Sequence, residues 1–333
     1  MLILIFDTVL NVAILDQVFN ICWLKKYSYF MISFAESCTK LRISQEGRVE
    51  FTNFKTISED CRRPIESNLT RLFTFNVPFT AMPTCFPSSI SFLSIRNDEI
   101  SMDEVNKASR CLSLPKSLET LAIKYTGMQS FKGLFCQSPA HLKTVWISNC
   151  KNNQPEFDFI WPSTIEVLYF DYCGLNQTHE NFSNATKLRD LRLRGNNLRS
   201  VPSNLPCSLR VLDLKKNMIS IANRDTWSCI SGLTELSFMY NKLTSFPERL
   251  PQSLESLDLS FNFLEYIPSF AFEGFMNLTR LILSNNRWVF DFTLYLLSVF
   301  LICMHLKVLS IFSWFDGMHF LSQNYKYAFE YAK

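Results

Sequence analysis

The sequence predicts an α/β repeat solenoid in which every repeat contributes one short strand to a continuous parallel sheet. The first observation is a motif, L-x-x-L-x-L-x-x-N-x-L, which occurs five times between Thr186 and Trp288. The second is its regular spacing, because the first leucines of the copies lie 21, 24, 21 and 24 residues apart. A fixed period in the twenties is typical of a solenoid. These first leucines are Leu188, Leu209, Leu233, Leu254 and Leu278.

The third observation is the alternation inside each copy, which predicts a strand. Leu212 and Leu214 flank Asp213 and place two leucines on one face. A lone strand leaves its backbone groups unpaired, whereas stacked repeats give each strand a parallel neighbour, and the rest of the repeat supplies the crossover. The recurring asparagine follows the strand, where its amide can satisfy the open backbone groups of the bend. We therefore expect a structural role for Asn196, Asn217, Asn241, Asn262 and Asn286.

Looser copies of the motif extend the repeats in both directions and give ten or eleven strands. A proline lies three residues before many first anchors, which predicts an extended and non-helical approach to the strand. The 21-residue repeats leave little room for a helix, and the longer ones can hold a short helical turn. The looser copies begin at Leu69, Ile90, Leu118, Leu142, Ile165 and Leu306.

The segment before the repeats, residues 38–68, predicts a hairpin that caps the open edge of the sheet. Its apolar residues alternate around a turn at Gln45-Glu46-Gly47, between Cys38 and Cys61. A solenoid must cover the bare core of its first repeat. We expect the repeats themselves to span residues 69–288.

Residues 1–37 are mostly apolar and predict a targeting or anchor segment. The basic pair Lys25-Lys26 follows the first apolar run instead of preceding it, as it would in a secretory signal. Four interpretations stay open: a cleaved signal, a signal that starts at this basic pair, an uncleaved anchor that attaches the protein to a membrane, and a mis-annotated start.

The eleven cysteines favour an oxidising compartment. Cys150 and Cys173 occupy the asparagine position of their repeats, and we expect them to be structural and reduced. Other cysteines precede successive strands, namely Cys85, Cys111, Cys136, Cys207 and Cys229. Pairs between adjacent repeats therefore stay open, and the sequence does not choose the connectivity. The candidates for disulfides near the amino-terminal end are Cys38, Cys61, Cys85 and Cys111.

Five N-glycosylation sequons also favour the secretory pathway. Their asparagines are Asn68, Asn176, Asn181, Asn184 and Asn277.

The repeats resemble those of extracellular leucine-rich repeat proteins, in particular Toll-like receptor ectodomains and small leucine-rich proteoglycans. The resemblance lies in the alternation of short P-x-x-L-P-x-S-L and longer F-x-G-F-x-N-L repeats. It implies a horseshoe with a concave parallel β-sheet and a mostly extended or short-helical convex side. The stretch from Asn286 resembles the start of a C-terminal cysteine cap, but Phe290 and Phe292 stand where the family has cysteines. Residues 289–333 are therefore expected to form a degenerate, cap-like helical segment.

A ligand site is expected on the concave face, where outward residues of successive strands can be read from the motif. Aromatic residues there adjoin basic ones, and Trp, Tyr and Arg are enriched at interface hot spots. The alternative is an ordinary exposed strand face with solvated charges. The candidate ligand-binding residues are Tyr125, Trp146, Tyr169, Tyr172, Arg192, Arg194, Lys215, Lys216 and Tyr240.

No catalytic or metal-binding motif occurs in the sequence, and its four histidines are isolated. A net charge of +3 indicates neither a nucleic-acid nor an acidic partner. We therefore expect a non-enzymatic recognition module without cofactor or metal, which binds a protein or glycan on its concave face and is extracellular or membrane-attached. The alternative is a cytoplasmic adaptor or scaffold, because short proline-punctuated repeats also resemble those of bacterial effector proteins.

Overall fold

The protein is described by a computed structural model. Its chain forms two compact units, and the boundary lies between Tyr169 and Phe170. The structure describes residues 21–24, 29–32, 40–43, 49–52, 70–75, 90–96, 114–124, 139–150, 161–177, 182, 184–222, 224–268, 271–288 and 308–310.

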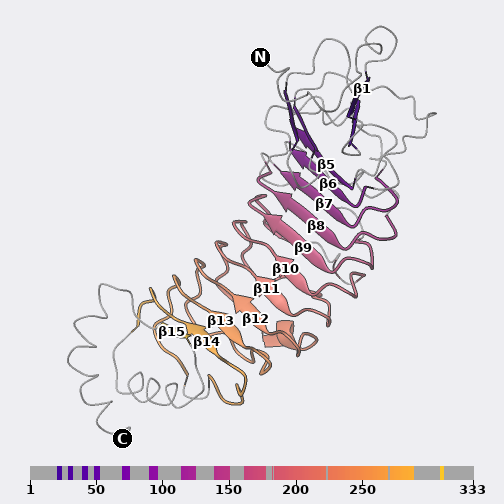
Figure 1. Ribbon diagram of the computed structural model, residues 1–333. Helices are drawn as coiled ribbons and strands as arrows, with labels where there is room; N and C mark the ends of the chain where they lie inside the picture. Colours follow the sequence, from indigo (N-terminus) through magenta and orange to yellow (C-terminus); the bar gives the residue numbers. More distant parts are fainter. Residues whose placement is uncertain are drawn as a thin grey trace, which may run out of the picture. The chain divides into compact units, whose positions relative to one another are not determined.

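Every predicted repeat contains a strand (Figure 1). The strands of the repeats are β5 (Arg71–Phe75), β6 (Phe92–Arg96), β7 (Thr120–Lys124), β8 (Thr144–Ser148), β9 (Val167–Asp171), β10 (Asp190–Arg192), β11 (Val211–Asp213), β12 (Glu235–Ser237), β13 (Ser256–Asp258), β14 (Arg280–Ile282) and β15 (Val308–Ser310). Before them come β1 (Ile21–Leu24), β2 (Tyr29–Ile32), β3 (Lys40–Ile43) and β4 (Val49–Thr52). The boundary between the units falls inside β9.

In the first unit, the sheet begins with β3 and β4, which lie within the segment 38–68 that we expect to cap it. β3 and β4 pair antiparallel with Ile43 opposite Val49. β4 then pairs parallel with β5, and β6, β7 and β8 follow in sequence order. β1 and β2, from the segment expected to target or anchor the protein, form a separate antiparallel pair.

In the second unit, strands β10 to β15 pair in parallel and in sequence order. Equivalent leucines align across the strands, as in the pairing of Leu191 with Leu212. The connections are mostly turns and bends, and one 24-residue repeat holds a short 3-10 helix, η2 (Arg224–Trp227). The fold is therefore the repeat solenoid that the sequence predicts, with extended or short-helical connections. No helix in the described parts of the chain is both long enough and apolar enough to cross a membrane.

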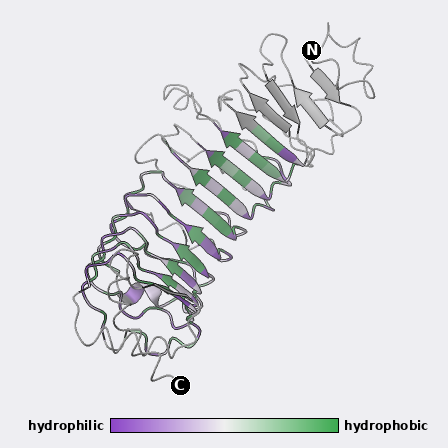
Figure 2. Cartoon of the chain, turned by 60° about the vertical axis from the view of Figure 1, so that its left-hand side comes forward, coloured by the Kyte–Doolittle hydropathy of each residue, from purple (hydrophilic) through white to green (hydrophobic). Residues whose placement is uncertain are grey.

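The strands bury every second side chain, because one face of the sheet lies against the core of the repeats. Figure 2 shows this as hydrophobic positions that alternate with paler or hydrophilic ones along the strands. Leu93 and Ile95 of β6 are buried, whereas Phe92, Ser94 and Arg96 are half-exposed. The half-exposed residues form the outer face of the sheet.

The motif asparagine satisfies backbone groups at the bend, as its position predicts, and it also links neighbouring repeats. Asn217 is buried and accepts a hydrogen bond from the Leu198 N–H at 3.1 Å. Its amide donates to the carbonyls of Leu193 and Leu214 at 2.8 and 2.9 Å. A buried polar group without partners costs about 1–3 kcal/mol, so this residue satisfies groups that would otherwise destabilise each bend.

The approach to the strand differs from the extended chain that the prolines predict. The carbonyl of Pro206 accepts the N–H of Leu209 at 3.0 Å, and that of Pro251 accepts the N–H of Leu254 at 3.2 Å. This contact between residues three apart closes a β-turn directly before the strand. The expectation of a non-helical approach is confirmed, but the expectation of an extended one is wrong.

The serine or threonine before the first leucine adds a second link between repeats. Ser208 Oγ donates to the Leu188 carbonyl at 2.8 Å, and Ser253 Oγ donates to the Leu233 carbonyl at 2.6 Å. Thr164 makes the equivalent contact with Leu142 in the first unit.

Four cysteines of the described residues are disulfide-bonded. Cys207 and Cys229 form a disulfide between adjacent repeats, with their Cα atoms 4.8 Å apart, which is one of the pairs that the sequence leaves open. Cys150 and Cys173, expected to be reduced, are both disulfide-bonded. The expectation failed because it treated each thiol only as a substitute for the buried asparagine.

Candidate functional site

The outer face of the first unit carries a stacked pair of aromatic side chains. Trp146 projects from the middle of β8 and its ring lies parallel to that of Tyr169 from β9, with centroids 5.6 Å apart and an interplanar angle of 7°. The ammonium group of Lys124 lies 6.0 Å from the Trp146 ring. A cation near the face of an indole is attracted by the ring quadrupole.

The indole N–H of Trp146 has no hydrogen-bond partner among the described residues, although its nitrogen is shielded from solvent. Buried polar groups in native proteins are usually satisfied. The neighbouring outward position belongs to Ala122, which is paired in register with Trp146 and is only 1 % exposed. A small residue thus lies beside the large aromatic pair on this face.

The second unit carries the basic residues of the predicted patch, and two of them are paired with carboxylates. Arg192 makes a bidentate contact with Asp190, at 3.0 and 2.9 Å. Arg194 contacts Asp213 at 2.7 Å through Nε and 2.6 Å through a terminal nitrogen. The predicted basic cluster is therefore a cluster of mixed charge.

Asp171 is the most perturbed acid among the described residues. Its carboxylate accepts the backbone N–H of Arg194 at 3.0 Å. Burial raises the pKa of Asp171 from 3.8 to about 6, and the charge of Asp213 adds to this rise. The N–H and the charge of Arg194 oppose it. The group therefore titrates closer to neutrality than an ordinary carboxylic acid.

Three of the predicted ligand residues lie where the strands end, at the carboxyl-terminal edge of the sheet, rather than on its outer face. Tyr172, Lys216 and Tyr240 each follow a strand and have φ values of 57°, 55° and 56°. This left-handed conformation turns the chain out of the strand, and it recurs at the equivalent position of other repeats. The three side chains are exposed at the carboxyl-terminal ends of the strands. Reading outward positions from the motif alone missed this change of direction.

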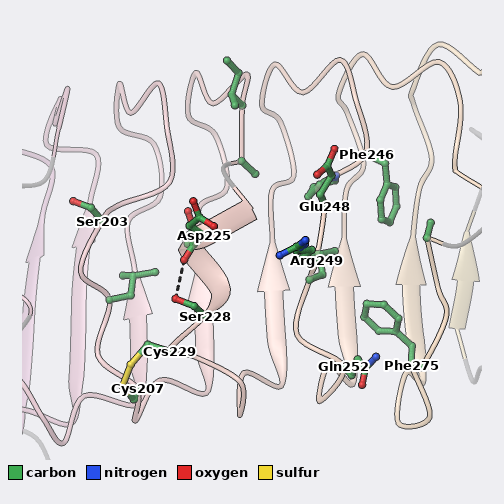
Figure 3. Close-up of a pocket in the computed structure, with 18 of the residues that line it drawn as sticks. Ser203, Cys207, Asp225, Ser228, Cys229, Phe246, Glu248, Arg249, Gln252 and Phe275 are labelled. Carbon is green, nitrogen blue, oxygen red and sulfur yellow. Dashed lines mark hydrogen bonds between the residues drawn. A yellow bond between two sulfur atoms is a disulfide. The ribbon is translucent and has the colours of Figure 1, made fainter.

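The crossover side of the second unit contains an open hollow of about 1740 Å³ (Figure 3). Its lining includes the Cys207–Cys229 disulfide and the side chains of Phe246, Arg249 and Phe275. None of the predicted ligand residues lines it. Within the described residues, no group of histidine, cysteine or acidic side chains could hold a metal ion.

The structure describes only part of the remaining predicted residues. Asn176, Asn184 and Asn277 of the sequons are exposed. Tyr125, Asn68, Asn181, the cysteines Cys38, Cys61, Cys85 and Cys111, and most of the segments 1–37 and 289–333, lie outside the described residues.

Sequence reasoning missed a group of exposed side chains that follow the asparagine of each repeat. Among them, Met218 is 40 % and Tyr266 is 61 % exposed. Lys242 and Arg287 are exposed beside the half-exposed Phe263. A signal was present in the sequence, because apolar or basic residues recur directly after the motif asparagine in N-M, N-K, N-F and N-R.

Comparison with known proteins agrees with the fold. The family model described as Leucine Rich Repeat matches residues 253–275. No curated protein sequence matches the chain. A structure of InlP from Listeria monocytogenes is similar over 66 % of this chain and 62 % of its own, with 22 % identity and a TM-score of 0.51.

Two further solved structures are similar. One is a chain of the octameric complex of latrophilin 3, Unc5D and the leucine-rich repeats of FLRT2, with 19 % identity over 81 % of this chain and 82 % of its own, and a TM-score of 0.51. The other is YopM from Yersinia enterocolitica, with 23 % identity, a TM-score of 0.46, and coverage of 66 % of this chain and 42 % of the YopM chain. The chain thus spans less than two thirds of the YopM and InlP chains.

Proposed function

We propose that this chain, which is a leucine-rich repeat protein, is a non-enzymatic recognition module that binds a protein ligand on the outer face of its β-sheet. Solenoids present a regular surface of outward side chains that no single repeat could build. The outer face here alternates aromatic, charged and small side chains in register from strand to strand. Such a face is suited to binding another molecule rather than to chemical transformation.

The observation that carries the proposal is the pair formed by Trp146 and Tyr169. Large aromatic side chains at the centre of an exposed face are enriched among interface hot spots. Both rings are half-exposed, so a ligand can contact them directly. Protein ligands offer aromatic and aliphatic side chains that pack against such rings.

An extracellular setting is the second part of the proposal. The Cys207–Cys229 disulfide supports it, since disulfides persist mainly in oxidising compartments. The exposed asparagines Asn176, Asn184 and Asn277 support it as well, because a glycan requires an accessible acceptor. A cytoplasmic adaptor would use the same sheet face but would carry reduced cysteines and no glycans.

The test is a binding screen followed by substitution at the aromatic pair. The full chain is screened against an array of secreted proteins and receptor ectodomains, and in parallel against a glycan array. Each hit is then titrated by biolayer interferometry against the Trp146→Ala variant. Because hot-spot truncations cost about 2 kcal/mol or more, we expect the Kd of a protein hit to rise at least about thirtyfold.

The matched control is Met276→Ala, which truncates a side chain that is 88 % exposed and lies in a connection rather than on the sheet. It should leave the Kd unchanged. A protein ligand that binds the Trp146→Ala variant as tightly as the unchanged chain would place the site elsewhere. Hits on the glycan array alone would replace the protein ligand by a carbohydrate.

A further inference from the structure

In the second unit, the residues that directly follow the strands form a continuous surface along the carboxyl-terminal ends of the strands. We call this row of strand ends the carboxyl-terminal edge of the sheet, and it is distinct from the outer sheet face. Backbone pairing continues past the strands, where the Lys216 N–H donates to Met239 O and the Tyr240 N–H donates to Ser260 O. Equivalent residues of successive repeats therefore lie side by side along this edge. We call the following six residues the edge strip: Lys216, Tyr240, Lys242, Phe261, Phe263 and Arg287.

Three residues of the strip are costly choices for their backbone conformation. Lys216, Tyr240 and Phe261 have φ values of 55°, 56° and 54°. The same position is held by asparagine or glycine in other repeats, at Asn149, Gly195 and Asn285. Left-handed backbone is disfavoured by about 1–2 kcal/mol for ordinary L-residues, and glycine and asparagine adopt it most readily. The turn of the repeat explains the conformation but not the large side chains placed on it.

Contacts between the side chains offset part of this cost and shape the surface. The rings of Tyr240 and Phe261 are stacked with centroids 4.0 Å apart. The guanidinium carbon of Arg287 lies 4.4 Å from the centre of the Phe263 ring. The strip nevertheless remains open to solvent, since Tyr240 is 41 % exposed.

The strip is also basic, in contrast to the sheet face. Lys216, Lys242 and Arg287 are exposed and form no ion pair within the described residues. On the outer face, by contrast, Arg192 and Arg194 are paired with aspartates. Uncompensated cations beside exposed aromatic rings favour a partner that is acidic and apolar.

The predicted glycan positions leave the strip accessible. Asn184 and Asn277 precede their strands and thus lie toward the opposite edge. Asn176 follows β9 and would place a glycan at the same edge in the repeat of Tyr172, before the strip begins.

We propose that the edge strip is a second interaction surface, which binds an acidic protein segment containing aromatic or aliphatic side chains. Four neighbouring repeats at about 4.8 Å each give the strip a length of about 15–20 Å, which an extended peptide of about six residues would span. The cations attract the acidic side chains, and the rings of Tyr240 and Phe263 supply the apolar contact. This inference goes beyond the sheet-face site proposed above and does not depend on Trp146 being a contact.

The test starts from a peptide library, because it makes no assumption about the natural partner. Phage-displayed random 12-mers are selected against the full chain, and the enriched peptides are synthesised with a fluorescent label. We expect the enriched peptides to be rich in Asp and Glu with interspersed apolar residues. Lys216→Glu/Lys242→Glu should weaken their binding by at least about tenfold in fluorescence anisotropy, and raised salt should weaken binding to the unchanged chain.

A matched control has the same change in charge at exposed positions away from the strip. Lys187→Glu/Arg249→Glu is suitable, since both residues are exposed and Arg249 shares the left-handed conformation of Lys216, with φ of 54°. This variant should bind within about twofold of the unchanged chain. Thermal melts followed by circular dichroism should show both variants folded.

The competing outcomes are distinct. An equal loss of peptide affinity in the strip variant and the control variant would attribute binding to net charge alone and overturn the proposal. Enrichment of neutral or basic peptides in the selection would also overturn it. Binding of a single-stranded oligonucleotide or heparin in place of the acidic peptides would also overturn it. Trp146→Ala should leave peptide binding intact, so failure of the sheet-face site and failure of the edge strip give different results.

Discussion

At the scale of single residues, an aspartate of the outer face can serve the backbone and a neighbouring arginine at once. Asp213 accepts the backbone N–H of Lys215 at 3.0 Å and also pairs with Arg194. Asp258 accepts the N–H of Ser260 at 3.0 Å without an arginine beside it. The carboxylate is thus first a cap for the end of the strand. The ion pairs are partly exposed and add little stability, about 0–1 kcal/mol each.

Asp171 gives a prediction about pH. Its pKa is raised above the ordinary value of 3.8 to about 6, so protonation favours the folded state, and the stabilisation is lost as pH rises through 6. Asp171→Asn keeps an oxygen that can accept the Arg194 N–H but carries no charge. At pH 7 we expect the variant to be more stable by about 1 kcal/mol, after allowance for solvent screening. Urea denaturation followed by circular dichroism at pH 7 and pH 5 measures this difference.

The difference between the two chains should shrink at pH 5, where Asp171 of the unchanged chain is mostly protonated. Asp258→Asn is the control, because it removes a carboxylate that also accepts a backbone N–H, that of Ser260, at the end of another strand. A gain in stability at pH 7 that persisted undiminished at pH 5 would contradict the assignment to protonation of Asp171.

The sequence predicts where a side chain lies when its role repeats with the motif. It misses the location of side chains whose direction depends on a local turn of the backbone. Leu212 and Asn217 are buried as their positions imply, since one strand face and one bend recur in every repeat. The motif places Tyr172, Lys216 and Tyr240 on the sheet face. The left-handed turn instead carries them to the edge, and this turn has no requirement for glycine that would reveal it in the sequence.

At the scale of elements, each repeat is held to the next by contacts of different chemical kinds. Strand pairing, the asparagine amide and the hydroxyl before the first leucine act in most repeats. Cys207 and Cys229 add a covalent link between the connections that lead into β11 and β12. The sequence shows all these residue types but not their geometry. The proline of P-x-S-L, for example, begins a β-turn rather than an extended segment.

The disulfide gives a prediction about the stability of this part of the solenoid. Its cysteines lie 22 residues apart in the sequence. Closing a loop of that length restricts the unfolded chain and stabilises the folded one by about 3 kcal/mol. We therefore expect Cys207→Ser/Cys229→Ser to lower the midpoint of urea denaturation under oxidising conditions.

The control for this change is Ser203→Ala/Ser245→Ala, which alters two exposed residues lining the same hollow and leaves the disulfide in place. It should denature like the unchanged chain. Identical denaturation of the cysteine double variant and the unchanged chain would show that the link contributes no stability.

At the scale of the whole molecule, the compartment decides which proposed partners the two surfaces can meet. The repeat fold itself is compatible with either setting, because its core consists of leucines and its links are mainly hydrogen bonds. Features outside the motif separate the alternatives. Exposed Cys207 and Cys229 would be open to reduction in the cytosol, and exposed Asn176, Asn184 and Asn277 would remain unmodified there.

Intact mass spectrometry of the protein from its native source tests the prediction that the protein is extracellular. We expect the mass to fall on treatment with an N-glycosidase, and to rise on reduction by two hydrogens for each disulfide opened. Substituting Thr186 and Thr279 by alanine removes two sequons without touching Asn184 or Asn277, and should abolish the corresponding glycan mass. An unglycosylated chain with free thiols at Cys207 and Cys229 would indicate a cytoplasmic scaffold instead. Its ligands would then have to be sought among intracellular proteins, although the geometry of the sheet face and of the edge strip would be unchanged.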